Sequence, residues 1–231
     1  MFPLHGLPLL DSAFPTGAFA HSFGLETAVR EGRVTSGREL ANWLKVSVQS
    51  GPAWMEGVAA FWTHRWVVSG AAVRHEDIED LDRRLTVSRL SRESREGSVK
   101  IGRRYVRLAA ELYPDSGVGL YRSWIDQGRC FGQAAVAHGW LWAGMGGDGE
   151  SAAGGYLYIS VMTGVQAALR LSVVGQTEAQ KVIRDLLPEV EAATARIARD
   201  PPAIGRMGSA GLLQEVAAMR HETLYSRLFM S

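Results

Sequence analysis

Apolar side chains recur every three to four residues along most of this 231-residue chain. That spacing places them on one face of an α-helix. No stretch of five or six residues alternates strictly between apolar and polar side chains with β-branched residues, so strands are not predicted. Hydrophobic residues make up 46% of the sequence, enough to bury a sizeable core. We therefore predict an all-α, single-domain bundle of about eight helices that spans residues 1–231.

Capping residues and prolines set the boundaries of these helices. Ser36 and Glu39 form a capping box, and Pro52 suits the first turn of the next helix. Pro114 closes a long helix, whereas Pro188 is expected to interrupt a later one. The predicted helices cover 36–50, 52–70, 76–85, 90–113, 119–143, 153–172, 177–199 and 209–221.

The overall charge and the single cysteine exclude several classes of protein. The formal net charge is +1, whereas nucleic-acid binding usually brings a strong basic excess. No run of about 18 uncharged apolar residues is long enough to span a membrane, and the first residues lack the basic start of a signal peptide. Cys130 has no partner for an internal disulfide, so we expect a cytoplasmic protein with a buried thiol.

No local motif predicts an enzyme. Gly144–Gly149 matches G-x-G-x-x-G, but a tryptophan-rich helix rather than a strand precedes it, so we expect a connecting loop and no bound nucleotide. The six histidines form no i, i+4 pair that could bind a metal. No G-x-S-x-G elbow is present. We predict no catalytic, cofactor-binding or metal-ligating residues.

Two segments near the ends of the chain have the composition of an interface. "DSAFPTGAFAHSFGLET" (11–27) holds three phenylalanines, and "YSRLFMS" (225–231) mixes apolar, aromatic and basic residues. Interfaces favour such aromatic and arginine side chains. Because their apolar residues have no evident partner within the chain, we expect the N-terminal segment (about 1–15) and the tail (about 222–231) to be ordered by a partner.

A third polar segment has two interpretations. "SRLSRESREGS" places Arg92, Glu93, Arg95 and Glu96 within one and a half helical turns. Such spacing is typical of a solvated ion-pair face that contributes little stability. It is also compatible with a surface that binds another protein.

Four segments in order along the chain resemble the UreF family of urease accessory proteins. They are "DSAFPTGAFAHSFGLET", "SRLSRESREGSVKIG" (88–102), "LRLSVVGQTEAQK" (169–181) and "RHETLYSRLFMS" (220–231). The resemblance implies an all-helical, dimeric and non-enzymatic chaperone for nickel insertion. Such proteins bridge the scaffold UreD (also called UreH) and the GTPase UreG and act on the urease apoprotein, with Ni²⁺ in transit and no tightly bound cofactor.

The same resemblance implies a set of partner-binding residues. They are Phe19, His21, Phe23, Glu26, Arg170, Gln176, Arg220, His221, Tyr225, Ser226, Arg227, Leu228 and Phe229. Two alternatives stay open. The chain could directly regulate GTP hydrolysis by UreG with Arg227 or Arg170 as an arginine finger, or it could be a helical metal carrier whose site forms only in the folded protein.

Overall fold

The computed structural model describes residues 4–70 and 75–231, and the regular elements within these ranges are all helices. The all-α prediction is confirmed. In chain order the α-helices are α1 (Leu7–Leu10), α2 (Leu25–Arg30), α3 (Gly37–Ser50), α4 (Pro52–Val68), α5 (His75–Ser88), α6 (Arg92–Leu112), α7 (Gly119–Asp126), α8 (Ala134–Gly144), α9 (Gly149–Arg170), α10 (Gln176–Arg199) and α11 (Leu212–Arg220).

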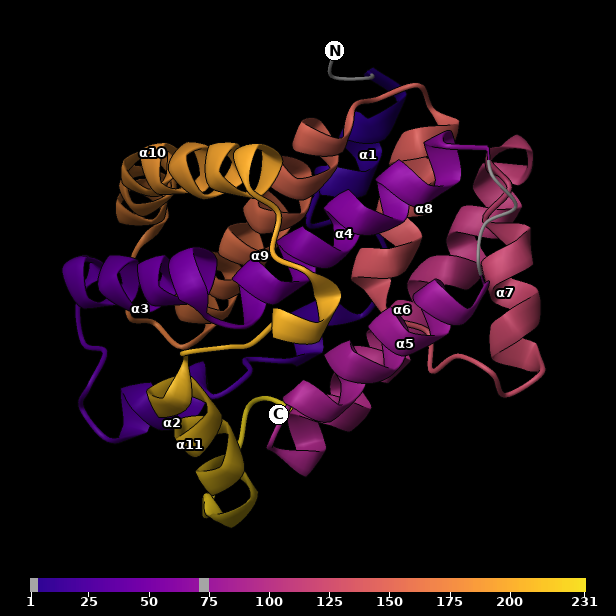
Figure 1. Cartoon of the computed structure of the whole chain (residues 1–231). Helices are drawn as coiled ribbons and strands as arrows, with labels where there is room; N and C mark the ends of the chain where they lie inside the picture. The colour runs from indigo at the N-terminus through magenta and orange to yellow at the C-terminus, as the bar shows by residue number, and fades with distance from the viewer. Residues whose placement is uncertain (1–3, 71–74) are drawn as a thin grey trace.

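Helix α4 lies in the middle of the bundle, where it packs against α8 on one side and α9 on another (Figure 1). Helix α9 also packs against α10, and α10 against α3. One apolar cluster lies between α3, α4, α9 and α10, and a second joins α4 to α5, α6, α7 and α8. Helix α8 is buried continuously from Ala134 to Trp142, which is why its sequence is apolar on every face.

The predicted helix starts at Ser36 and Pro52 are confirmed. The Ser36 hydroxyl accepts a hydrogen bond from the main-chain N–H of Glu39 (3.4 Å). The Glu39 carboxylate in turn accepts the N–H of Thr35 (2.8 Å). Pro52 occupies the first turn of α4, where its missing N–H would have no helical partner.

The helix predicted over 119–143 is wrong as a single element, because residues 127–133 separate α7 from α8. Gly128 and Gly132 adopt positive φ in this connection, which suits glycine and breaks a helix. The buried carboxylate of Asp82 holds the connection in place by accepting the N–H groups of Phe131, Gly132 and Gln133 and the Tyr121 hydroxyl. Cys130 is buried beside it, as predicted, and burial raises the pKa of its thiol to about 12.

Two further helix boundaries differ from the predictions. Pro188 does not interrupt α10, which runs unbroken from Gln176 to Arg199. Its ring lies on the exposed side, while Leu186 and Val190 pack into the core and hold the flanking turns together. Helix α9 begins at Gly149, directly after the glycine-rich loop, and Asp148 caps it by accepting the N–H of Ser151 (2.7 Å).

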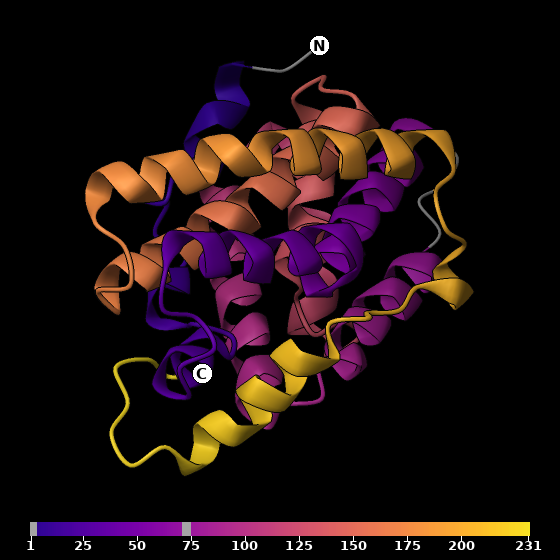
Figure 2. The same cartoon turned by 90° about the vertical axis from the view of Figure 1, so that its left-hand side faces the viewer.

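Residues 18–30 and the C-terminal tail reach the same part of the molecule, away from α1 (Figure 1). Helices α2 and α11 lie beside each other, and the C-terminal tail returns toward α2 and the start of α6 (Figures 1 and 2). Gly24 precedes α2 with φ of 89°, and a Cβ there would lie 2.8 Å from the Gln214 carbonyl oxygen of α11. A glycine is therefore required at this contact for both its conformation and its size.

Candidate functional site: the tail-docking cluster

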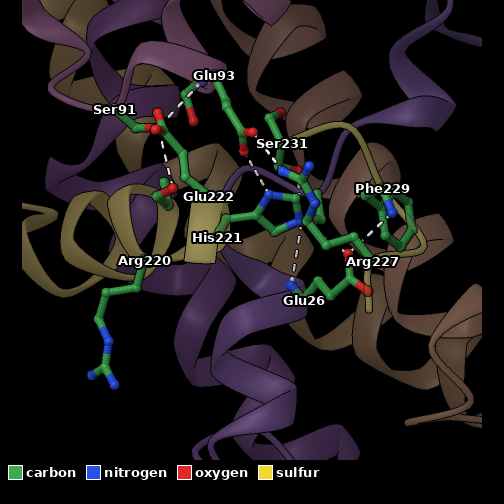
Figure 3. A network of polar contacts seen from close by, with 12 residues as sticks. Glu26, Ser91, Glu93, Arg220, His221, Glu222, Arg227, Phe229 and Ser231 are labelled. Atoms are coloured by element: carbon green, nitrogen blue, oxygen red, sulfur yellow. Dashed lines mark hydrogen bonds and ion pairs between the residues drawn. The ribbon is translucent and has the colours of Figure 1, made fainter. Parts of the chain in front are cut away.

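Three segments far apart in the sequence form one polar network at this end of the bundle (Figure 3). They are residues 19–26, the first turn of α6 with Glu93, and residues 221–231. We call this network the tail-docking cluster. Its hydrogen bonds join residues more than 100 positions apart, so only the tertiary fold creates it.

Glu26 lies at the centre of the cluster and is fully buried in the first turn of α2. Its Oε1 accepts the main-chain N–H of Leu228 (2.7 Å), and its Oε2 accepts that of Phe229 (3.0 Å). These N–H groups are charge-assisted donors to a carboxylate. The Glu26 side chain therefore fixes the path of the tail across α2.

His221 links two carboxylates from different helices. Its Nε2 lies 3.0 Å from Glu26 Oε2, and its Nδ1 lies 2.7 Å from Glu93 Oε2. Both ring nitrogens of His221 therefore contact a carboxylate. Arg227 also donates to Glu93 Oε1 (2.6 Å). Two carboxylates and two basic side chains thus lie in direct contact.

Ser231 is held by the turn that precedes α2. Its main-chain oxygen accepts the N–H groups of Ser22 (2.7 Å) and Phe23 (3.1 Å) and the Ser22 hydroxyl (2.8 Å). The Ser231 hydroxyl lies 2.8 Å from His21 Nδ1. Phe23 has φ of 50°, a left-handed conformation that is uncommon outside glycine. It brings two consecutive N–H groups to one oxygen, as in a backbone nest.

Arg170, at the end of α9, contacts both the first segment and the tail. Its guanidinium lies 4.3 Å from the centre of the Phe229 ring and 5.8 Å from that of Phe19, and it donates to the Phe19 carbonyl oxygen. Phe229 is buried in the apolar cluster that also contains Leu25. Cation–π contacts of this kind stabilise an arginine over an aromatic face.

The charged groups of the cluster have shifted pKa values. Burial by itself would raise the pKa of Glu26, but the N–H groups of Leu228 and Phe229 together with His221 outweigh burial and lower it. The pKa of Glu93 is lowered in the same way, because its contacts with His221 and Arg227 outweigh its burial. Burial, with the nearby charges of Lys100 and Arg89, lowers the pKa of His21 to about 4, so this ring is neutral at pH 7.

A partly open cavity of about 270 Å³ lies next to the cluster. Its walls include His21 and Phe23 from residues 19–26, Tyr156 from α9 and the ion pair between Glu56 and the buried Arg89. The Arg89 guanidinium lies 4.8 Å from the centre of the Phe23 ring. The turn that binds the tail therefore also closes one side of this cavity.

The structure brings together most residues expected to bind a partner, although they contact one another. His21, Phe23, Glu26, Arg170, His221, Arg227, Leu228 and Phe229 belong to the cluster or contact it. Arg220 points away from it (Figure 3) and pairs with Glu31 (3.0 Å). Gln176 begins α10, and no contact in the described part of the chain joins it to the cluster. Phe19, Tyr225, Ser226 and Leu228 are exposed.

One expectation about the tail is wrong. Its apolar residues were expected to have no partner within the chain, yet Phe229 is buried and Ser231 is hydrogen-bonded to residues 21–23. The tail folds back because Glu26, which the sequence shows only as a helix residue, is buried and needs donors. Whether a partner is required to order residues 1–15 or 222–231 stays a prediction, and residues 1–3 lie outside the described part.

Sequence reasoning missed three members of the cluster. Ser22 and Ser231 have no distinctive sequence context. Glu93 belongs to the Arg/Glu-rich run that was expected to be solvated or to bind another protein; instead it contacts the chain's own tail, and neighbouring Arg92 pairs with Glu222 (3.2 Å). Within residues 4–70 and 75–231, no three potential ligands among His, Cys, Asp and Glu are grouped as a metal site. Over the same residues, no helix combines the length and apolarity needed to cross a membrane.

Comparison with known proteins gives a consistent result. The family model for UreF matches residues 34–187. Three similar proteins are each named urease accessory protein UreF. The one from Bacillus sp. (strain TB-90) is 32% identical over 96% of both chains, and the one from Arthrobacter sp. (strain FB24) is 33% identical over 96% of this chain and 94% of its own. The one from Lachnoclostridium phytofermentans is 32% identical over 100% of this chain and 99% of its own.

Proposed function

This chain belongs to the UreF family of urease accessory proteins, and from that premise we propose that it is a non-catalytic adaptor in urease maturation. In this proposal it bridges the scaffold UreD (UreH) and the GTPase UreG, and the assembly delivers Ni²⁺ into apo-urease. Nickel is cargo rather than a resident cofactor. The protein acts in the cytoplasm, as a homodimer.

The tail-docking cluster is the observation that carries this proposal. It fixes an otherwise extended tail against α2 and α6, so that the side chains facing outward have a defined arrangement. Phe19 is 69% exposed, Leu228 is 50% exposed, and Tyr225 is fully exposed. Aromatic and apolar side chains presented on a rigid support are typical anchors of protein interfaces. We assign this surface to the scaffold partner.

The cluster also gives Arg227 a positioning role. The side chain donates to Glu93, which in turn contacts His221. Loss of Arg227 would release the segment that presents Tyr225 and Leu228 without removing either anchor. Because Arg227 and Arg170 both have partners within the chain, no observation favours either of them as an arginine finger for UreG.

The test is co-purification of UreD and UreG with wild-type protein and with Arg227→Ala. We expect Arg227→Ala to weaken binding of UreD by about tenfold or more, with little change in the melting temperature. Arg206→Ala is the matched control, because Arg206 is exposed and has no ion pair in the described part of the chain. Equal recovery of UreD with all three proteins would show that this surface does not bind the scaffold.

A further inference from the structure

Helix α6 carries four basic residues within eight positions, all of them exposed. They are Lys100, Arg103, Arg104 and Arg107, and we call them the basic face. At 3.6 residues per turn they fall within an arc of about 100°. The opposite side of the helix buries Tyr105, Val106 and Ala109 in the core. The charges are therefore concentrated on the side that faces away from the bundle.

The members of the basic face are not ion-paired within the described residues, unlike many arginines elsewhere in this chain. Asp80 pairs with Arg83 and Arg84, for example, and Glu79 with Arg129. In contrast, no member of the basic face forms an ion pair with any residue in 4–70 or 75–231. Within the same residues, the one hydrogen bond from this face is that of Arg103, whose Nε donates to the carbonyl oxygen of Phe131 (2.8 Å).

This arrangement opposes the stability of the helix. Lys100 and Arg104 are four positions apart, as are Arg103 and Arg107, and like charges at this spacing repel each other. The fold needs only the apolar stripe of α6, so nothing in the core requires cations at these exposed positions. Local choices that work against the fold are expected where a surface has another task.

We propose that the basic face docks against an acidic surface of a partner protein. Charge complementarity identifies the partner's chemistry, since four unpaired cations attract carboxylates and accelerate encounter. The inference rests on the proposed function, because it adds a second contact to the same adaptor. Arg104 also lies beside the turn that precedes Phe19: a Cβ built on Gly17 would be 3.9 Å from the Arg104 Nη1. The basic face thus reaches the segment that carries Phe19, one of the residues assigned to the scaffold surface.

The surroundings of the basic face favour a protein over a nucleic acid. Its four charges span only about 10 Å along the helix, and Glu96 and Glu111 bound it on the same face one turn beyond each end. A nucleic-acid backbone running along α6 would meet these carboxylates. Phe131, which is 43% exposed next to Arg103, adds an aromatic side chain of the kind that protein interfaces use.

The experiment measures how purified UreD (UreH) and UreG bind to full-length protein at two salt concentrations, about 50 and about 200 mM NaCl. The test variant carries Lys100→Glu, Arg104→Glu and Arg107→Glu. The matched control carries Lys181→Glu, Arg199→Glu and Arg206→Glu, which reverse as many exposed charges without an ion pair in the described residues. A milder variant with glutamine at 100, 104 and 107 covers the case in which charge reversal impairs folding.

We expect the test variant to lose about tenfold or more in affinity for at least one of the two proteins at low salt. The glutamine variant should lose less affinity than the test variant, and the control should lose less than about threefold. The differences in affinity between these variants and the wild-type protein should be smaller at the higher salt concentration. If the wild-type protein binds UreD or UreG and the test and glutamine variants bind equally well, the inference about the basic face is overturned and the proposed function is not. Failure of the wild-type protein to bind either partner would overturn the proposed function as well. A third outcome is that the wild-type protein binds a single-stranded RNA of about 20 nucleotides, the test variant does not, and binding of UreD and UreG is unchanged. That result would overturn the inference and assign the basic face to nucleic acid.

Discussion

The tail-docking cluster predicts a specific consequence for Glu26→Gln. The glutamine oxygen can still accept one main-chain N–H, but its NH₂ group then faces the other N–H or the His221 ring. The variant loses one charge-assisted acceptor and leaves His221 with a single carboxylate. Hydrogen bonds to charged groups contribute about 1.5–3 kcal/mol each. We therefore expect docking of the tail to weaken by about 3 kcal/mol.

A loss of this size is large for a local contact. Since 1.4 kcal/mol corresponds to a factor of ten, the fraction of molecules with an undocked tail should rise by roughly 150-fold. The bundle itself should stay folded, because α3, α4, α9 and α10 pack without contribution from Glu26. Hydrogen exchange read peptide by peptide separates the two effects: exchange should accelerate in residues 221–231 and 20–26, and stay unchanged in α4 and α9.

Limited trypsin digestion gives an independent measure, because Arg227 becomes a better cleavage site when the tail is undocked. Glu191→Gln is the control, since Glu191 is an exposed α10 residue with no ion pair in the described part of the chain. Equal exchange in the tails of Glu26→Gln and wild-type protein would refute the reasoning. It would mean that Phe229 and Ser231 hold the tail without the Glu26 carboxylate.

Two further predictions concern stability. Because the pKa of His21 falls from 6.5 to about 4 on folding, the unfolded chain binds the extra proton between these values, and stability should decline as the pH drops through that window. In urea unfolding, the free energy of unfolding of the wild-type protein should fall between pH 7 and 5, and this fall should be about 2 kcal/mol smaller in His21→Gln. His138, whose pKa burial lowers to about 3, contributes equally to both proteins. Asp82→Asn should cost about 3 kcal/mol in urea unfolding at pH 7, because the buried carboxylate accepts three main-chain N–H groups. A cost below about 1 kcal/mol would contradict the assigned role of Asp82.

In the proposed adaptor, the basic face and the tail-docking cluster would provide two kinds of contact. The cluster uses its charges internally, so what it presents outward is mainly apolar and aromatic. The basic face forms no ion pair within the described residues and presents its charges outward. Apolar anchors mainly slow dissociation, whereas exposed charges mainly accelerate association. The two surfaces are therefore separable by their dependence on salt.

Local sequence signals were sufficient to predict the fold class and most of the helices. A helical period of apolar residues, the capping box at Ser36 and Pro52 in a first turn depend only on neighbours within a few residues. The same local signals were misleading at Pro188, where core packing on both sides keeps α10 continuous, and at residues 127–133, where Asp82 holds a break from another helix. Tertiary contacts outweigh local propensity at such places.

The contacts of the two terminal segments with each other could not be predicted from local signals. The sequence identified their residues as interface-like, but it could not pair Glu26 with the N–H groups of Leu228 and Phe229, about 200 positions away. A buried carboxylate must find donors wherever the fold supplies them, and here the chain's own tail supplies them. The amino-acid pattern thus indicates which segments have the composition of an interface. Their contact with each other depends on the three-dimensional fold.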